Sequence, residues 1–164
     1  MISKILLTTD GSEAAETAAP YAVEFARAFG AELQVMYVVD TDAMSYSLGP
    51  EQVDRIRTGQ FQEMTELHER AAGAIDRIRE YAAEADLEIE PVIEAGNPVD
   101  VITRFAAAAG VDVIVMTSAG RGGVRRALLG SVTERVARTT SIPVLVVDPD
   151  SGDPETAATE REAA

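Results

Sequence analysis

Short apolar runs alternate along the chain with longer segments whose apolar residues recur at helical spacing. The apolar runs predict buried β-strands at residues 4–8, 31–39, 88–94, 111–116 and 143–147. The periodic segments predict helices at residues 13–29, 61–85, 98–109 and 131–139. Strand, helix and strand in succession form a βαβ unit, whose crossover is right-handed and whose strands pair in parallel. We therefore expect an α/β fold: an open five-stranded parallel sheet with helices on both faces, Rossmann-like, whose ligand crevice lies where the strand order reverses.

Capping residues mark where several of these elements begin and end. Asn97 is a preferred N-cap residue and Pro98 follows it at the first helical position, so a helix should begin there. Gly30 and Gly110 mark helix ends. Pro20 lies inside the first predicted helix, and we expect it to kink the preceding turn.

The 164 residues predict one domain, at positions 1–148, followed by an acidic tail. The tail, residues 149–164, consists of small and polar residues without periodicity, and we expect it to be disordered. Residues 41–60 are polar and are interrupted by glycine and proline, which predicts a mobile loop with room for one short helix.

The composition limits the classes of function. The chain has no cysteine, which excludes thiol catalysis and cysteine-ligated metals, and its single histidine, His68, cannot build a multi-histidine metal site. The first apolar run is too short for a signal segment or a membrane span, so we expect a cytoplasmic protein with no membrane partner. A formal net charge of −14 argues against nucleic-acid binding, because no basic face would displace counterions from phosphates.

Lys4 is the only lysine, and the basic residues are otherwise arginines. An acidic, lysine-poor surface suggests adaptation to a high-salt cytoplasm, where screening removes the self-repulsion of such a charge. This composition suggests a halophilic archaeon as the source.

The segment at residues 113–134 suggests a ligand. Its strand ends near Thr117 and continues into a loop with glycines and three arginines, among them Arg121. Ser131, followed three residues later by Glu134, fits a capping box, in which each side chain binds an orphan backbone N–H. The first turn of a helix favours an anion, and arginines gathered in an acidic chain suggest the phosphate tail of a nucleotide. The alternative is a surface loop whose arginines are solvated.

Gly120, nine intervening residues and then Gly130-Ser131 resemble the nucleotide motif of the universal stress protein family. The family pattern is Gly, two residues, Gly, nine residues, Gly and then Ser or Thr. In this chain Thr117 occupies the position of the first glycine. The resemblance implies an adenine nucleotide alpha hydrolase-like fold, and we expect Thr117 to weaken nucleotide binding because its β-branched side chain reduces the room in the crevice.

Two further positions match the family. The segment Thr9-Asp10-Gly11-Ser12 resembles the motif after the first strand, which implies that Asp10 contacts the ribose or phosphate side of a nucleotide. The alternative for Asp10 is a turn residue that binds nearby backbone. Val38 matches the position whose backbone contacts adenine in ATP-binding members, and it is equally suited to be a buried strand residue. The strand at 143–147 resembles the one that pairs across the family's homodimer, which suits an apolar edge strand.

The resemblance implies a stress-response protein that binds ATP, alone or with Mg²⁺, as a regulatory ligand. We expect no enzyme, because phosphoryl transfer needs metal-binding carboxylates and a positioned nucleophile, and the crevice offers only Asp10, Asp40 and the arginines. The chain also lacks the P-loop motif and the dinucleotide-binding glycine motif. The alternative function is a dimeric adaptor that binds no nucleotide and acts through protein contacts. The predicted nucleotide-binding residues are Thr9, Asp10, Val38, Thr117, Gly120, Arg121, Gly130, Ser131 and Val132.

Overall fold

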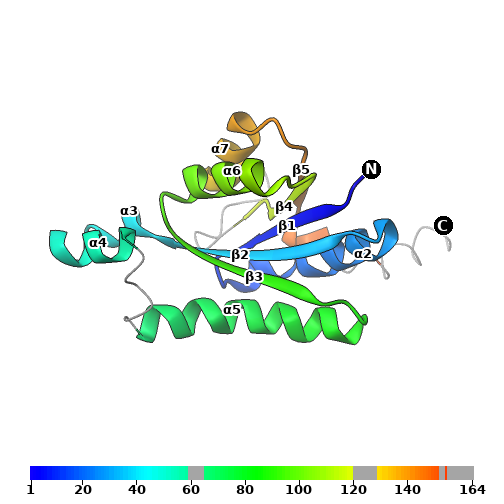
Figure 1. Cartoon of the computed structure of the whole chain (residues 1–164), viewed down its shortest axis with the longest axis horizontal. Coiled ribbons are helices and arrows are strands. Elements are labelled where there is room, and N and C mark those ends of the chain that lie inside the picture. Colours follow the sequence, from blue (N-terminus) through cyan, green and yellow to red (C-terminus); the bar gives the residue numbers. More distant parts are fainter. Residues whose placement is uncertain (59–64, 120–128, 152–153, 155–164) are drawn as a thin grey trace.

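The computed structural model describes residues 1–58, 65–119, 129–151 and 154. The five described strands form one parallel sheet in the order β3-β2-β1-β4-β5, which confirms the predicted fold class (Figure 1). The strands are β1 (Lys4–Thr9), β2 (Glu32–Asp40), β3 (Ile89–Gly96), β4 (Val113–Thr117) and β5 (Val144–Val147). The chain places β2 and β3 on one side of β1 and places β4 and β5 on the other, so the strand order reverses between β1 and β4.

Helices cover both faces of the sheet, because the side chains of each strand point alternately to opposite faces. On one face α2 (Ala19–Phe29) and α5 (Thr65–Glu84) pack against Ile5 and Leu7 of β1. On the other face α6 (Pro98–Ala109) and α7 (Ser131–Thr139) pack against Leu6. Figure 1 shows α6 and α7 above the sheet and α5 below it. Each of these three aliphatic side chains is fully buried, and full burial of one contributes about 1.5–3 kcal/mol.

The helix predicted at residues 13–29 is wrong as a single element, because the structure divides it into α1 (Glu13–Glu16) and α2. Pro20 lies in the first turn of α2. Proline has no N–H to donate, and its ring clashes with the carbonyl four residues earlier, which here belongs to Glu16. The Thr17 hydroxyl instead donates to the Ala14 carbonyl at 2.7 Å and closes α1. The proline therefore begins a new helix rather than kinking one.

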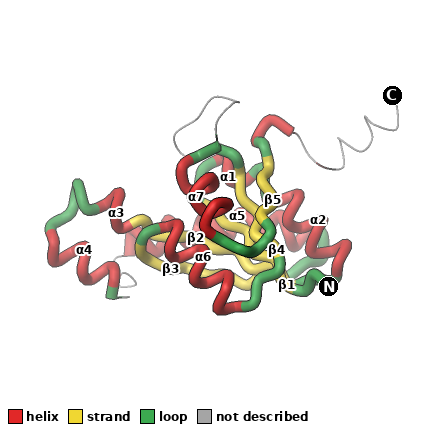
Figure 2. The backbone as a smooth tube through the Cα atoms, turned by 90° about the horizontal axis from the view of Figure 1, so that it is seen from above, coloured by secondary structure: helices red, strands yellow, loops and turns green. Residues whose placement is uncertain are grey.

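Two helices lie where the sequence predicted a loop at residues 41–60. They are α3 (Thr41–Met44) and α4 (Pro50–Arg57), and residues 59–60 lie outside the described part. Val53 and Ile56 of α4 are 7% and 0% exposed, so this segment buries an apolar face that its polar composition hides. We call residues 41–57 the arm. Figure 2 shows α3 and α4 together at one end of the molecule.

The predicted caps at Asn97, Gly30 and Gly110 are confirmed. The Asn97 side chain accepts hydrogen bonds from the first turn of α6, and Gly30 and Gly110 end α2 and α6 in the left-handed conformation. Residues Pro149–Ser151 form the short 3₁₀ helix η2, and the rest of the predicted tail, Pro154 apart, lies outside the described residues. None of the described helices is long and apolar enough to cross a membrane.

Candidate functional site

A cavity of about 360 Å³ lies at the carboxyl ends of β1, β2 and β4. This is the predicted place for a ligand, because the strand order reverses between β1 and β4 and the loops on either side diverge there. Side chains from α3, α5 and α6 and the first turn of α7 complete its walls.

Asp10 follows β1 and forms a turn at the edge of the cavity. Its Oδ1 accepts hydrogen bonds from the amide of Ser12 at 3.0 Å and from the hydroxyl of Ser12 at 2.5 Å. The Ser12 hydroxyl oxygen in turn accepts a hydrogen bond from the Ala15 amide at 3.1 Å and caps α1. The structure therefore gives Asp10 the turn role, and Asp10 also lines the cavity, so the two interpretations of this residue are compatible.

Gly11 allows this turn to approach α5 closely. Its φ of +77° is left-handed, and a Cβ atom built on it would lie 3.3 Å from the Cβ of Ala74 and 3.5 Å from a ring carbon of Tyr37. Arg77 of α5 donates to the Gly11 carbonyl at 3.1 Å and forms an ion pair with Glu16. The turn after β1 is thus held against α5 by contacts on both sides.

Thr117, at the end of β4, folds back on its own loop. Its hydroxyl donates to the Ala119 carbonyl at 2.6 Å, and the residue is only 8% exposed. Side chains alternate along a strand, so Thr117 lies on the same face as Val113 and Val115, which belong to the α2–α5 core. Thr117 lines the cavity without filling it.

The predicted capping box at Ser131 and Glu134 is wrong. Gly130 is the N-cap residue of α7: its carbonyl accepts from the Glu134 amide at 2.9 Å, and its own amide donates to the Ser118 carbonyl at 2.7 Å. The helix thus begins with Ser131 as its first residue, too late for the serine to cap it. Among the described residues no side chain caps α7, and the Glu134 carboxylate instead accepts from Arg138 at 3.1 Å. The exposed Ser131 hydroxyl makes no hydrogen bond among the described residues.

Val38 lies where β2 extends beyond β1. The pairing of β1 with β2 ends at Thr9 opposite Tyr37, whereas β2 continues to Asp40 and stays paired with β3 over those last residues. The edge of β2 that faces β1 is therefore uncovered by a strand from Val38 onward. This edge forms one wall of the cavity.

The charged side chains in the described lining are Asp10, Asp40 and Arg70. Asp40 caps α3, because its Oδ1 accepts from the amides of Asp42 and Ala43 at 3.0 Å each. Arg70 is half exposed, and its described partner is Glu66 at 3.6 Å. The cavity therefore holds two carboxylates engaged in helix starts and one cation on its open side.

The family model for universal stress proteins matches residues 1–148. The chain belongs to the universal stress protein family. A relative in this family, the universal stress protein MJ0531 of Methanocaldococcus jannaschii, is 34% identical over 148 residues, which cover 90% of this chain and 82% of that protein. The solved structure of MJ0577 from the same organism has a TM-score of 0.71 at 30% identity and covers 90% of this chain and 96% of its own. A universal stress protein solved in complex with cAMP shares the fold, with a TM-score of 0.62 at 24% identity and coverage of 91% of this chain and 98% of that one.

The residues that carried the resemblance to this family converge in the fold. The cavity is lined by Thr9, Asp10, Val38, Thr117, Gly130, Ser131 and Val132, which come from β1, β2, β4 and α7. Gly120 and Arg121 lie outside the described residues, as do Arg125 and Arg126. The first strand and the fourth are about a hundred residues apart in the sequence, and their parallel pairing brings the two motifs together.

Sequence reasoning missed the outer walls of the cavity. These are Ala43 and Met44 of α3, Leu67 and Arg70 of α5, and Pro98 and Ile102 of α6. Leu67 and Ile102 belong to the apolar stripes of their helices, so periodicity assigns them to the core, and nothing local separates a core position from a cavity position. Arg70 looks like one more solvated charge on an amphipathic helix, where it pairs with Glu66 one turn earlier.

Proposed function

We propose that this universal stress protein binds an adenine nucleotide, ATP, in the cavity at the carboxyl ends of β1, β2 and β4, as a regulatory ligand. The observation that carries the proposal is the start of α7, whose first turn lines the cavity without a side-chain cap. The N–H groups there need an acceptor, and the helix dipole favours an anion. A phosphate group supplies both.

Another part of the lining suits the base. Met36, Val38, Ile102 and Met116 give that part of the lining its apolar character. Beyond Tyr37 the edge of β2 that faces β1 has no strand beside it. The backbone groups on this edge can therefore pair with the polar edge of a purine. Asp10 and Thr9 lie at the end of β1, which is between β2 and β4 in the sheet. This position suits a contact with the ribose.

We expect ATP to act here as a ligand rather than as a substrate. Mg²⁺ bound with ATP takes most of its ligands from phosphates and water, with one or two carboxylates from the protein. Asp10 and Asp40 are the carboxylates of the described lining, and both already accept hydrogen bonds from helix starts. These two carboxylates are better suited to hold a bound metal ion than to activate an attacking water. We propose a cytoplasmic protein that responds to stress, with no nucleic-acid or membrane partner.

The proposal is tested by mass spectrometry of ligand released from freshly purified protein, followed by calorimetry with ATP, AMP and cAMP. The informative variant is Ser131→Ala, because the hydroxyl lies at the start of α7 but does not cap the helix. We expect it to weaken ATP binding about tenfold, the value of one hydrogen bond to a charged group, with an unchanged melting temperature. Gly130→Val adds bulk to the lining and should abolish binding. An absence of binding heat for the native chain, with no nucleotide released, would refute the proposal.

The edge strand β5 supports a second property. Val144, Leu145 and Val146 are only half-buried, and β5 pairs with β4 alone. Because an apolar edge strand tends to find a partner, we propose a homodimer through residues 143–147. Light scattering at micromolar concentration tests it, and a monomer there would overturn it. A dimer that binds no nucleotide in calorimetry would favour the adaptor function instead.

A further inference from the structure

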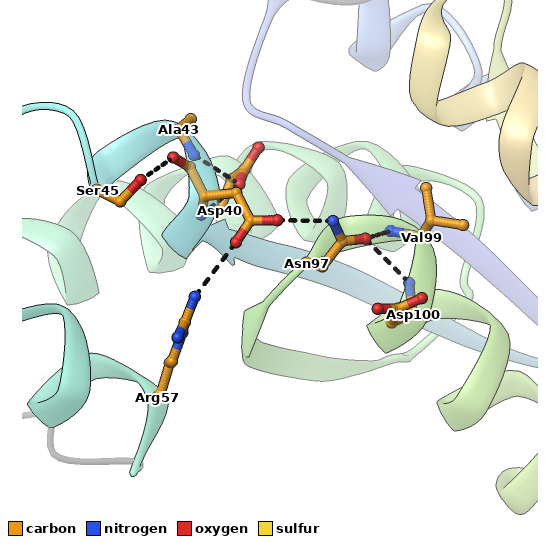
Figure 3. Close-up of polar contacts among 8 residues, drawn as sticks. Asp40, Ala43, Ser45, Arg57, Asn97, Val99 and Asp100 are labelled. Atoms are coloured by element: carbon orange, nitrogen blue, oxygen red, sulfur yellow. Dashed lines mark hydrogen bonds and ion pairs between the residues drawn. The ribbon is translucent and has the colours of Figure 1, made fainter.

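The arm, residues 41–57, is joined to the body of the protein through Asp42. One carboxylate oxygen of Asp42 accepts a hydrogen bond from the side-chain amide of Asn97 at 2.7 Å, and the other lies 3.4 Å from the guanidinium of Arg57. The Asp42 carbonyl also accepts a hydrogen bond from the Ser45 hydroxyl at 2.7 Å. Figure 3 shows Asn97 at the start of α6 and Arg57 approaching from α4. Asp42 therefore connects α3, α4 and α6.

Asn97 uses both halves of its amide group. Its Oδ1 accepts from the amides of Val99 at 3.1 Å and Asp100 at 3.3 Å and so caps α6, while its Nδ2 donates to Asp42. The orientation of the amide follows from its partners, because backbone N–H groups need an acceptor and a carboxylate needs a donor. The side chain that starts α6 therefore also holds α3.

Both of the helices that this hydrogen bond joins are walls of the cavity. Ala43 and Met44 of α3 line it on one side, and Pro98 and Ile102 of α6 line it next to them. Asp42 directly precedes Ala43, and Asn97 directly precedes Pro98. The distance between the two walls is thus set by a contact one residue away from each.

The arm is also attached through apolar side chains, since Ile56 belongs to the α2–α5 core and Met44 packs against that core. The polar links of the arm to α6 and within the arm are exposed. The side chains of Arg57 and Asp42 are 55% and 52% exposed, and an ion pair in that setting contributes little. The hydrogen bond from Asn97 is exposed as well, but at 2.7 Å to a charged acceptor it is the shorter of the two polar links.

We propose that the hydrogen bond between Asp42 and Asn97 is a latch that fixes the arm as a wall of the cavity, so that Asp42 and Asn97 are positioning residues for the base of the nucleotide. The inference rests on the proposed nucleotide function. When the latch is broken, the arm samples positions in which Met44 no longer closes the cavity. The apparent dissociation constant then rises in inverse proportion to the latched fraction.

The test exchanges the two side chains. Asn97→Asp keeps the cap of α6, since asparagine and aspartate cap about equally well, but it places two carboxylates face to face. We expect ATP binding about 10-fold weaker in calorimetry, which corresponds to a latched fraction of about one tenth. Adding Asp42→Asn restores a donor opposite a carboxylate, and the double variant should bind within about threefold of the native protein. Arg57→Gln is the matched control and should change affinity less than twofold.

Hydrogen exchange of residues 41–57 provides a readout that needs no ligand. We expect Asn97→Asp to speed exchange across the arm and the double variant to slow it again, while Ser131→Ala leaves it unchanged. If the native chain binds no nucleotide, the proposed function fails, and the exchange pattern still decides whether the latch exists. Exchange and affinity that match the native values in Asn97→Asp would overturn the latch. A double variant no better than Asn97→Asp would overturn it as well.

Discussion

Thr133 joins α7 to the end of β4 through its hydroxyl group, and removal of this hydroxyl should be measurable as a loss of stability. The Thr133 hydroxyl donates to the Thr117 carbonyl at 2.8 Å, between residues that are 6% and 8% exposed. Thr133→Val keeps the shape of the side chain and removes the donor, so the Thr117 carbonyl loses its partner in a buried hydrogen bond.

The size of the effect follows from that burial. Leaving a buried acceptor without its partner costs about 1–3 kcal/mol. For a chain of this length, 1 kcal/mol shifts the melting temperature by about 2–4 °C, so we expect a decrease of about 2–12 °C. The same bond fixes the end of β4 against α7, and both elements line the cavity, so ATP affinity should fall together with stability.

Urea unfolding monitored by circular dichroism gives the free energy of unfolding, and Thr103→Val is the matched control. The Thr103 hydroxyl also donates to a carbonyl at 2.8 Å, that of Val99, but the bond stays inside α6 and is only partly buried. We expect the control to lose less than about 0.5 kcal/mol. Equal losses in Thr133→Val and Thr103→Val would refute the reasoning, because they would show that the bond between β4 and α7 adds nothing beyond a local contact.

Three further predictions concern stability. Hydrogen bonds from the amide and hydroxyl of Ser3 and the amide of Lys4 hold the pKa of Asp112 below its ordinary value of 3.8, so its contribution is present above that pH and is lost as the pH falls. Melts from pH 7 to pH 2 should show Asp112→Asn less stable than the native protein at neutral pH and converging with it in acid, and a constant gap would contradict this. Gly11→Ala should destabilise by about 1–2 kcal/mol because φ is +77° and Ala74 is close, whereas Gly73→Ala inside α5 should stabilise by about 0.5–1 kcal/mol, both measured by urea unfolding. The net charge of −14 predicts a melting temperature that rises from dilute buffer to molar salt, and a flat or falling profile would remove the high-salt interpretation.

The sheet could be predicted from the sequence because its central strands, β1, β2 and β4, are almost completely buried. The residues of β4 are buried on both faces, so its first four positions form an unambiguous apolar run. The arm could not be predicted in this way. Its apolar residues, among them Val53 and Ile56, are spread through a polar segment, and their burial depends on a surface built by distant residues. The sequence shows that Pro20 interrupts the first predicted helix. It does not show whether the helix bends there or ends and is followed by a new helix.

The candidate site was predictable where it follows strand ends. Asp10 and Thr117 directly follow or end buried strands, and parallel strands bring their carboxyl ends together. The helical walls of the cavity could not be predicted, since Leu67 and Arg70 reach the cavity only through the packing of α5 on the sheet. The capping box failed for a related reason. Ser131 and Glu134 have the right spacing, but the tertiary bond from the Gly130 amide to Ser118 fixes the start of α7 one residue earlier.

The capping of the helix starts explains why an anionic ligand would bind at α7. The helices α1, α3, α6 and α7 all begin just beyond the carboxyl end of a strand, so their N-terminal partial positive charges gather at one end of an acidic protein. Ser12, Asp40 and Asn97 cap the first three and satisfy N–H groups there. Gly130 has no side chain to do the same for α7. The fold thus collects a favourable field at this end and leaves uncapped donors at the helix whose first turn lines the cavity, and a phosphate group placed there would gain both.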